Sequence, residues 1–227
     1  MVNMKRQLKS FITDDLKKKM VFISGPRQVG KTWLAKNIAA DYKDPLYLNY
    51  DSFEDRKIIE EKSWIDIDLL ILAEIHKMPG WKIYLKGLYD TKEESLHILV
   101  TGSARLEAFK GSGESLAGRY FNYRLMPLSL KELGSNTALM MNKLILRGGF
   151  PEPFNSNSDD DAAKWRKQYA EGLIRDDILD FEKIHDFKSI KLLFELLRSR
   201  VASPLSLTFL AEDIGISPIT VKKYVDM

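Results

Sequence analysis

The stretch Gly-Pro-Arg-Gln-Val-Gly-Lys-Thr at residues 25–32 limits the possible folds of this chain more than any other feature. It matches the pattern of a glycine, any four residues, a glycine, a lysine and then a serine or threonine, which forms phosphate-binding loops. A short apolar run at residues 20–24 precedes it, and apolar residues at helical spacing follow it. A phosphate-binding loop follows a strand and precedes a helix, and the flanking sequence here meets both conditions. We therefore predict a phosphate site at this loop.

The residue types in this loop suit a nucleotide. Glycines let the chain curl so tightly that several backbone N–H groups point at the phosphates. The Lys31 ammonium can reach the β- and γ-phosphates, and the Thr32 hydroxyl can ligate Mg²⁺. We therefore expect ATP and Mg²⁺ as cofactors, with Thr32 as the metal ligand. The expected nucleotide-binding residues are Gly25, Pro26, Arg27, Gln28, Val29, Gly30, Lys31 and Thr32.

Apolar runs that alternate with helical patterns indicate an α/β fold. The expected strands are residues 20–24, 46–51, 68–73, 97–103 and 120–125, and the expected helices between them include residues 53–62, 80–90 and 104–109. Continuous apolar strands separated by helices form parallel sheets that are covered on both faces. The predicted fold class is a P-loop NTPase sheet of about five parallel strands flanked by helices, followed by a small all-α lid and the start of a winged helix.

Beyond Pro127 the sequence predicts helices and no further strand. Helices are expected at residues 129–147, 162–183 and 187–202, with two short ones at the end and a loop at 148–161. The predicted domains are a nucleotide-binding core (1–130), a helical lid (131–203) and a partial helix-turn-helix unit (204–227).

The third predicted strand runs into Ala73 and then Glu74. In phosphate-loop enzymes a strand beside the loop ends in an acid that holds Mg²⁺ through water, and in many ATPases a glutamate follows and polarises the attacking water. Glu74 is therefore the expected catalytic base, whereas Ala73 has no oxygen to offer. Asp68 lies about 16 Å back along the strand and is too far away to substitute.

Six sequence blocks extend these observations over nearly the whole chain. In order, they are GPRQVGKT, LLILAEIHKMPGW, LVTGS, SLAGR, PLSLKEL and GGFPEP. Together they resemble the uncharacterised prokaryotic AAA-type ATPases with a C-terminal helix-turn-helix region. That family has Leu-Asp-Glu-Ile where this chain has Leu72, Ala73, Glu74 and Ile75. The alanine is a departure, either a natural loss or an engineered substitution, and we expect it to impair ATP hydrolysis.

The resemblance implies two further catalytic groups. A polar side chain after the fourth strand contacts the γ-phosphate or the attacking water, which favours Ser103 over the nearby Thr101; a simple strand-ending turn is the alternative. An arginine before the fifth strand acts as a finger in the neighbouring subunit, which favours Arg119 and a homo-oligomer; a surface arginine is the alternative. Weaker candidates are Arg105, Arg124 and Arg147.

The C-terminal residues have the spacing of a helix-turn-helix unit, with Ala211, Gly215 and Val221 at its small, turn and apolar positions. The rest of the predicted core comprises Leu207, Leu210, Ile214 and Tyr224, and the predicted exposed face carries Thr220, Lys222 and Lys223. This face suits DNA in the major groove, and it equally suits a structural or protein-binding winged helix. The chain stops inside the second helix without a wing, so we expect a fragment of a longer protein.

Composition excludes several other classes. The absence of cysteine excludes disulfides and thiolate metal sites. No apolar run approaches the ~18 residues of a membrane span, and no apolar h-region follows the basic N-terminus. We therefore expect a cytoplasmic protein without a membrane partner. The net charge of +3 is too small to indicate nucleic-acid binding by itself.

Two other functions stay open beside the ATPase. One is a small-molecule phosphate-loop kinase, which would transfer phosphate only to an acceptor. The other is a nucleotide-gated DNA-binding or adaptor module with little turnover, which Ala73 and the helix-turn-helix pattern favour. A GTPase is disfavoured because no Asn-Lys-x-Asp stretch appears, and Asn-Lys-Leu-Ile at 142–145 lacks the aspartate.

Overall fold

The computed structural model describes residues 5–103, 116–134, 137–173, 175 and 186–226. The chain forms two compact units, Met1–Ser156 and Asn157–Met227. Their boundary lies inside the segment 131–203 that was expected to be a lid, so the division into three domains stays a prediction.

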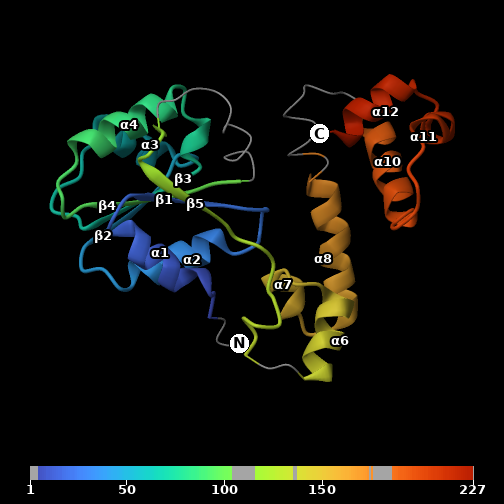
Figure 1. Cartoon of the computed structure of the whole chain (residues 1–227), viewed down its shortest axis with the longest axis horizontal. Coiled ribbons are helices and arrows are strands. Elements are labelled where there is room, and N and C mark those ends of the chain that lie inside the picture. Colours follow the sequence, from blue (N-terminus) through green and yellow to red (C-terminus); the bar gives the residue numbers. More distant parts are fainter. Residues whose placement is uncertain (1–4, 104–115, 135–136, 174, 176–185, 227) are drawn as a thin grey trace. The chain divides into compact units, whose positions relative to one another are not determined.

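The first unit contains the predicted parallel sheet, which confirms the α/β fold class (Figure 1). Its strands are β1 (Met20–Ser24), β2 (Pro45–Asn49), β3 (Leu69–Ala73), β4 (His97–Thr101) and β5 (Tyr120–Arg124). Their order across the sheet is β2-β3-β4-β1-β5, and every neighbouring pair is parallel. β1 and β3 are buried along their whole length, as their apolar sequences predict.

Helices cover both faces of this sheet (Figure 1). They are α1 (Leu8–Leu16), α2 (Lys31–Ala39), α3 (Phe53–Glu61) and α4 (Trp81–Thr91), together with the short 3₁₀ helix η1 (Ile75–Lys77). Strand residues alternate between two cores. Leu70 and Leu72 pack with residues of α3 and α4. Leu69 and Ile71 pack with residues of α1 and α2, so Ala73, two residues further along, faces the α2 side. The sequence analysis did not predict α1.

The segment after β5 differs from the prediction. The expected helix at 129–147 is wrong in its first part, because residues 130–134 form a turn and the helix α6 is only Ala138–Arg147. The expected loop at 148–161 contains α7 (Pro151–Phe154) and the start of α8 (Asp159–Gly172). Proline at the first position starts α7, and the Ser158 side chain caps α8 ahead of an acidic first turn. The expected helix at 104–109 lies outside the described residues.

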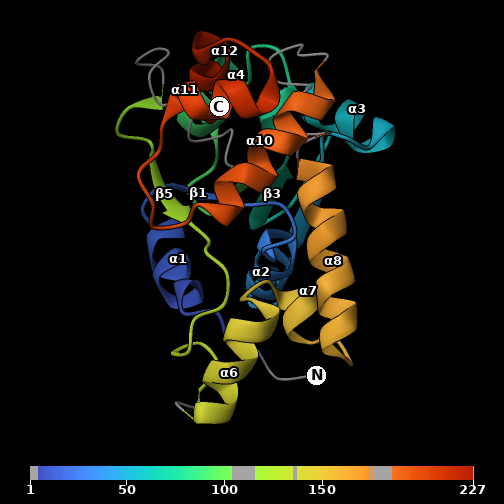
Figure 2. The same ribbon diagram turned by 90° about the vertical axis from the view of Figure 1, so that its right-hand side faces the viewer.

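The second unit is helical in the part that the structure describes. It contains α8, α10 (Phe187–Ser199), α11 (Leu207–Ile214) and α12 (Pro218–Val225), the last three of which lie together (Figure 2). Leu210, Ala211 and Val221 are buried with Leu193 of α10, which confirms the predicted core of the helix pair. Gly215 has a φ of 79° in the turn between α11 and α12. No helix in the described part of the chain has the length and apolarity needed to cross a membrane.

Candidate nucleotide-binding site

The loop between β1 and α2 has the backbone conformation of a tight cradle. Gly25 has a φ of 146°, and a Cβ atom there would lie 2.4 Å from the Leu125 carbonyl oxygen, so no other residue fits beside the end of β5. Gln28 and Gly30 also have positive φ values, 59° and 100°. The first backbone bond of α2 runs from the Leu34 N–H to the Gly30 carbonyl oxygen, so the helix N-terminus faces the loop.

The Lys31 ammonium is held inside the curl of the loop. It donates to the carbonyl oxygens of Gly25 and Pro26 at 2.9 and 2.7 Å. A lysine that lies against loop carbonyls at a helix N-terminus concentrates positive charge where phosphates bind. The role of Lys31 in binding phosphates stays a prediction.

The carboxyl ends of neighbouring strands lie side by side at this edge of the sheet. Thr101 is paired in register with Ala73 on one side and with Ile23 on the other. Asn49, at the end of β2, is paired with Ala73. The ends of β1, β3 and β4 therefore meet at the edge from which the phosphate loop leaves.

Glu74 stands directly after β3 in a left-handed conformation, with a φ of 55°. Its side chain is partly buried, and this burial raises the pKa of its carboxyl group, while the charges of Lys77, Lys31 and Arg27 act in the opposite direction. His76 Nε2 lies 3.7 Å from its carboxylate. The structure therefore places Glu74 within electrostatic reach of two phosphate-loop residues, where the sequence analysis expected a base.

Ala73 is buried and presents only a methyl group at the strand end. The Asp68 carboxylate instead accepts hydrogen bonds from the backbone N–H groups of Lys43 and Asp44, at 2.8 and 3.0 Å. These two residues directly precede β2. Asp68 therefore lies at the opposite edge of the sheet and does not substitute for an acid at position 73.

Thr32 has a neighbour that the sequence analysis missed, Tyr47 on β2. Burial raises the pKa of the Tyr47 hydroxyl, and the Thr32 side chain acts in the opposite direction. The Lys36 ammonium lies 5.3 Å from the centre of the Tyr47 ring. Nothing in the local sequence marks Tyr47, because strand β2 only meets α2 in the folded chain. Tyr47 belongs to the half-buried rim of the α2-side core.

The donors at this site suit a magnesium ion only when a nucleotide supplies most of the oxygens. Among the residues that the structure describes, no three His, Asp or Glu side chains are grouped to hold a metal. Mg²⁺ is typically bound through one or two protein oxygens, substrate phosphates and water. The Thr32 hydroxyl fits that mode, and Ala73 leaves the supporting acid missing.

Ser103 and Thr101 differ in exposure. Thr101 is almost fully buried at the end of β4, whereas Ser103 follows the strand and is half-buried. Both lie at the phosphate-loop edge of the sheet, because the Gly102 N–H between them donates to the Ile23 carbonyl oxygen at 3.2 Å.

Arg119 does not join this site within one chain. It precedes β5, and its carbonyl oxygen accepts the N–H of Met20, the first residue of β1, at 3.1 Å. The phosphate loop leaves the other end of β1, about 16 Å away along a five-residue strand. The Arg119 guanidinium is instead bidentate to the Asp90 carboxylate at 2.8 and 3.0 Å.

The weaker arginine candidates are also spread apart. Arg124 is the last residue of β5, at the phosphate-loop edge, and Arg147 donates to the carbonyl oxygen of Ser156. Arg105 lies outside the described residues. A further arginine, Arg6, contacts the phosphate loop directly and was missed because it precedes the motif by some twenty residues.

Comparisons with protein families and sequences give two regions of similarity. A family model described as an AAA domain matches residues 17–134, more than half of the chain, and one described as a domain of unknown function matches residues 139–227. An uncharacterized protein of Mycobacterium tuberculosis is 24% identical over 209 residues, which are 91% of this chain and 47% of that protein. One of Methanocaldococcus jannaschii is 26% identical, over 85% of this chain and 49% of that protein. The chain spans about half the length of the curated relatives it matches.

Solved structures with a similar fold include a Walker-type ATPase of Pyrococcus abyssi. Its TM-score is 0.52 at 13% identity, covering 84% of this chain and 78% of that one. The Holliday junction branch migration motor RuvB of Thermotoga maritima has a TM-score of 0.49 at 19% identity, covering 94% and 82%.

Proposed function

Because this chain belongs to the AAA domain family, we propose that it binds ATP with Mg²⁺ at residues 25–32 and hydrolyses it slowly. The observation that carries this proposal is the position of the Lys31 ammonium. It is enclosed by loop carbonyls at the N-terminus of α2, close enough to Glu74 for the two charges to interact. A cation, a helix N-terminus and a carboxylate around one loop suit a triphosphate and an attacking water.

Binding would draw on groups that are already in position. Lys31 would exchange the carbonyl oxygens of Gly25 and Pro26 for phosphate oxygens. The N–H groups at the start of α2 would donate to the same phosphates. Mg²⁺, held by the Thr32 hydroxyl and the phosphates, would neutralise charge on the β- and γ-oxygens. None of these contacts needs an acid at position 73, so ATP binding should survive the alanine.

Hydrolysis would depend on Glu74. Its carboxylate would accept a hydrogen bond from the attacking water, and a pKa raised by burial brings a base closer to neutral pH. Ala73 lacks the oxygen that would steady the metal as charge develops, and this loss slows the reaction. Ser103 after β4 is the proposed contact to the γ-phosphate or the water, with Thr101 as the alternative.

Arg119 is the proposed finger for a neighbouring copy. Its distance from the phosphate loop of its own chain favours action across a subunit interface over action within the chain. In this role the guanidinium would leave Asp90 and contact the transferred phosphoryl group of the next subunit. A homo-oligomer belongs to this proposal.

A nucleotide-gated DNA-binding or adaptor module is the second candidate. Two observations favour it: Ala73, and the packed helices α11 and α12 with Lys222 and Lys223 exposed on α12. Thr220 is less available than expected, because its backbone N–H and hydroxyl engage the Ser217 cap. DNA in the major groove, or a winged helix that binds protein, both suit this surface.

Turnover measured with and without duplex DNA tests these alternatives, on the chain as given and on Ala73→Asp. An ATPase should gain rate from Ala73→Asp without DNA. An adaptor should bind ATP, stay slow in both forms and change its DNA affinity with nucleotide. Phosphate transfer to an added acceptor, with no release to water, would instead indicate a kinase.

A further inference from the structure

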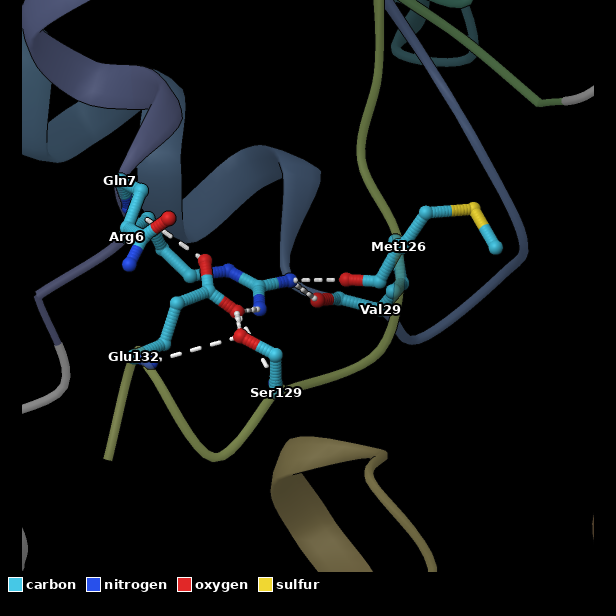
Figure 3. Close-up of polar contacts among 6 residues, drawn as sticks. All are labelled: Arg6, Gln7, Val29, Met126, Ser129 and Glu132. Carbon is cyan, nitrogen blue, oxygen red and sulfur yellow. Dashed lines mark hydrogen bonds and ion pairs between the residues drawn. The ribbon is translucent and has the colours of Figure 1, made fainter. Parts of the chain in front are cut away.

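A buried arginine outside the phosphate motif, Arg6, hydrogen-bonds the backbone of the phosphate loop. Arg6 precedes α1, and only 5% of its surface is exposed. One guanidinium nitrogen donates to the carbonyl oxygens of Val29 and Met126, both at 2.8 Å, and the other donates to the Glu132 carboxylate at 3.1 Å (Figure 3). One side chain therefore joins the N-terminal segment, the phosphate loop and the segment after β5.

The carboxylate beside this guanidinium is itself held by backbone hydrogen bonds. Glu132 also accepts the backbone N–H groups of Gln7 and Ser129, at 3.3 and 3.1 Å (Figure 3). Burial lowers the pKa of Arg6, and the Glu132 carboxylate opposes that effect. Burying a charge is costly unless a fixed partner compensates it. The Ser-Leu-Lys-Glu turn at 129–132 supplies that partner, because it fixes the Glu132 carboxylate beside the Arg6 guanidinium.

The contact with Val29 determines the direction of the next peptide N–H. The peptide bonds of the described chain are trans, and in a trans peptide the C=O and the following N–H point in opposite directions. With the Val29 carbonyl turned toward Arg6, the Gly30 N–H is turned away from it. Gly30 is the N-cap of α2, where the N–H groups that bind phosphate begin.

We propose that Arg6 is a positioning residue for nucleotide binding: it orients the Val29–Gly30 peptide so that the Gly30 N–H faces the phosphates. This inference rests on the proposed function. It requires the phosphate loop to bind a nucleotide, but it requires neither hydrolysis nor a second subunit. A lysine cannot replace the arginine, because one ammonium cannot span three acceptors that a planar guanidinium reaches at once.

The experiment compares two variants with the unchanged chain. Arg6→Lys keeps the charge beside Glu132, while the double variant Arg6→Met with Glu132→Met removes both charges together, which avoids an unpaired buried ion. Leu16→Ala on α1 is the matched control. Leu16 is buried in the same hydrophobic core as Val29, so this change lowers stability, but Leu16 takes no part in the hydrogen bonds of Arg6. Thermal unfolding gives each Tm, and calorimetry well below that Tm gives the Kd for ATP and for ADP.

We expect both Arg6 variants to lose about tenfold or more in affinity for ATP and for ADP, the effect of one charge-assisted hydrogen bond. Leu16→Ala should keep its affinity despite a lower Tm. If the double variant or Arg6→Lys binds both nucleotides as tightly as the unchanged chain, Arg6 serves stability alone and this inference is wrong. If the unchanged chain binds neither nucleotide, the proposed function fails as well.

Discussion

The backbone N–H of Glu74 donates to the carbonyl oxygen of Thr101 at 2.9 Å. The ladder between β3 and β4 thus continues one residue past the strand, and the backbone of the proposed base is fixed by its neighbour. This backbone hydrogen bond of Glu74 does not involve the side chain at position 73. The alanine therefore lacks the carboxylate and leaves the backbone around it intact, so Ala73→Asp tests the effect of the carboxylate alone.

Ala73→Asp should raise kcat while changing ATP affinity far less. One electrostatic contact that strengthens in the transition state is typically worth ~10²- to 10³-fold in rate. Steady-state hydrolysis and nucleotide binding at matched Mg²⁺ concentrations measure the two effects. Ala73→Asn is the control, because it has nearly the same shape without the charge and should restore little. If the chain as given already turns over as fast as Ala73→Asp, another group holds the metal.

Lys31→Ala should weaken ATP binding by about tenfold to a hundredfold, because the ammonium makes charge-assisted contacts to the phosphates. Calorimetry measures the change directly. Lys57→Ala is a suitable control, because that ammonium lies over the Phe53 ring on α3. Unchanged ATP affinity in Lys31→Ala would remove the phosphate-loop interpretation.

Arg119 and Glu74 should complement each other between chains. On the Ala73→Asp background, mixing Arg119→Ala chains with Glu74→Gln chains should restore part of the lost turnover, because one type of hybrid interface carries both intact groups. Turnover of the parent should also rise more than linearly with protein concentration until oligomers saturate.

The control for this mixing experiment is Arg198→Ala, which removes an exposed arginine paired with Glu195 on α10. It should leave turnover unchanged. Mixtures that demonstrably co-assemble and yet show no rescue would mean that no arginine finger acts through Arg119 in trans.

Glu74→Gln should stabilise the fold at neutral pH. Burial raises the pKa of Glu74 in the folded state, so between its ordinary and raised values the folded chain keeps a proton that the unfolded chain has lost. Stability therefore falls as pH rises through that window, and the full penalty applies above it. The Tm difference between Glu74→Gln and the unchanged chain should grow as pH rises above about 4, the ordinary pKa of a glutamate, and should level off above the raised pKa. A difference independent of pH would show that the ionised carboxylate carries no penalty.

Tyr47→Phe should weaken the affinity for Mg²⁺ at Thr32 and so raise the Mg²⁺ concentration that turnover requires. The change removes a hydroxyl that interacts with the side chain of Thr32, the proposed metal ligand. Losing a group that orients a metal ligand typically costs ~10- to 100-fold in metal affinity. The measurement is the Mg²⁺ concentration for half-maximal turnover on the Ala73→Asp background. Tyr84→Phe is the control, because it loses a hydroxyl that donates to the Ile59 carbonyl oxygen at 2.6 Å, away from the loop. Equal Mg²⁺ requirements in the two variants would contradict the role of Tyr47.

Local patterns in the sequence were enough to predict the five strands, the phosphate loop and the core of the C-terminal helix pair. Each depends on spacing within a few residues, such as the apolar run of β3 or the positions of Ala211, Gly215 and Val221. The same approach was wrong for residues 129–147, because a helical pattern there competes with the turn in which Glu132 reaches Ser129 and Arg6. That turn is favoured by a contact with a residue far away in the chain, which no local window contains.

The sequence by itself therefore determined which chemical groups the phosphate loop carries and that an alanine stands where a carboxylate is expected. Only the tertiary structure decided which groups surround them. It places Asn49 and Thr101 on either side of Ala73 and brings Tyr47 close to Thr32. It also brings Arg6 into contact with the Val29 carbonyl oxygen and puts Arg119 at the opposite edge of the sheet. The physical reason is that parallel strands align their ends only when the sheet assembles, so residues distant in sequence become neighbours through strand order and register.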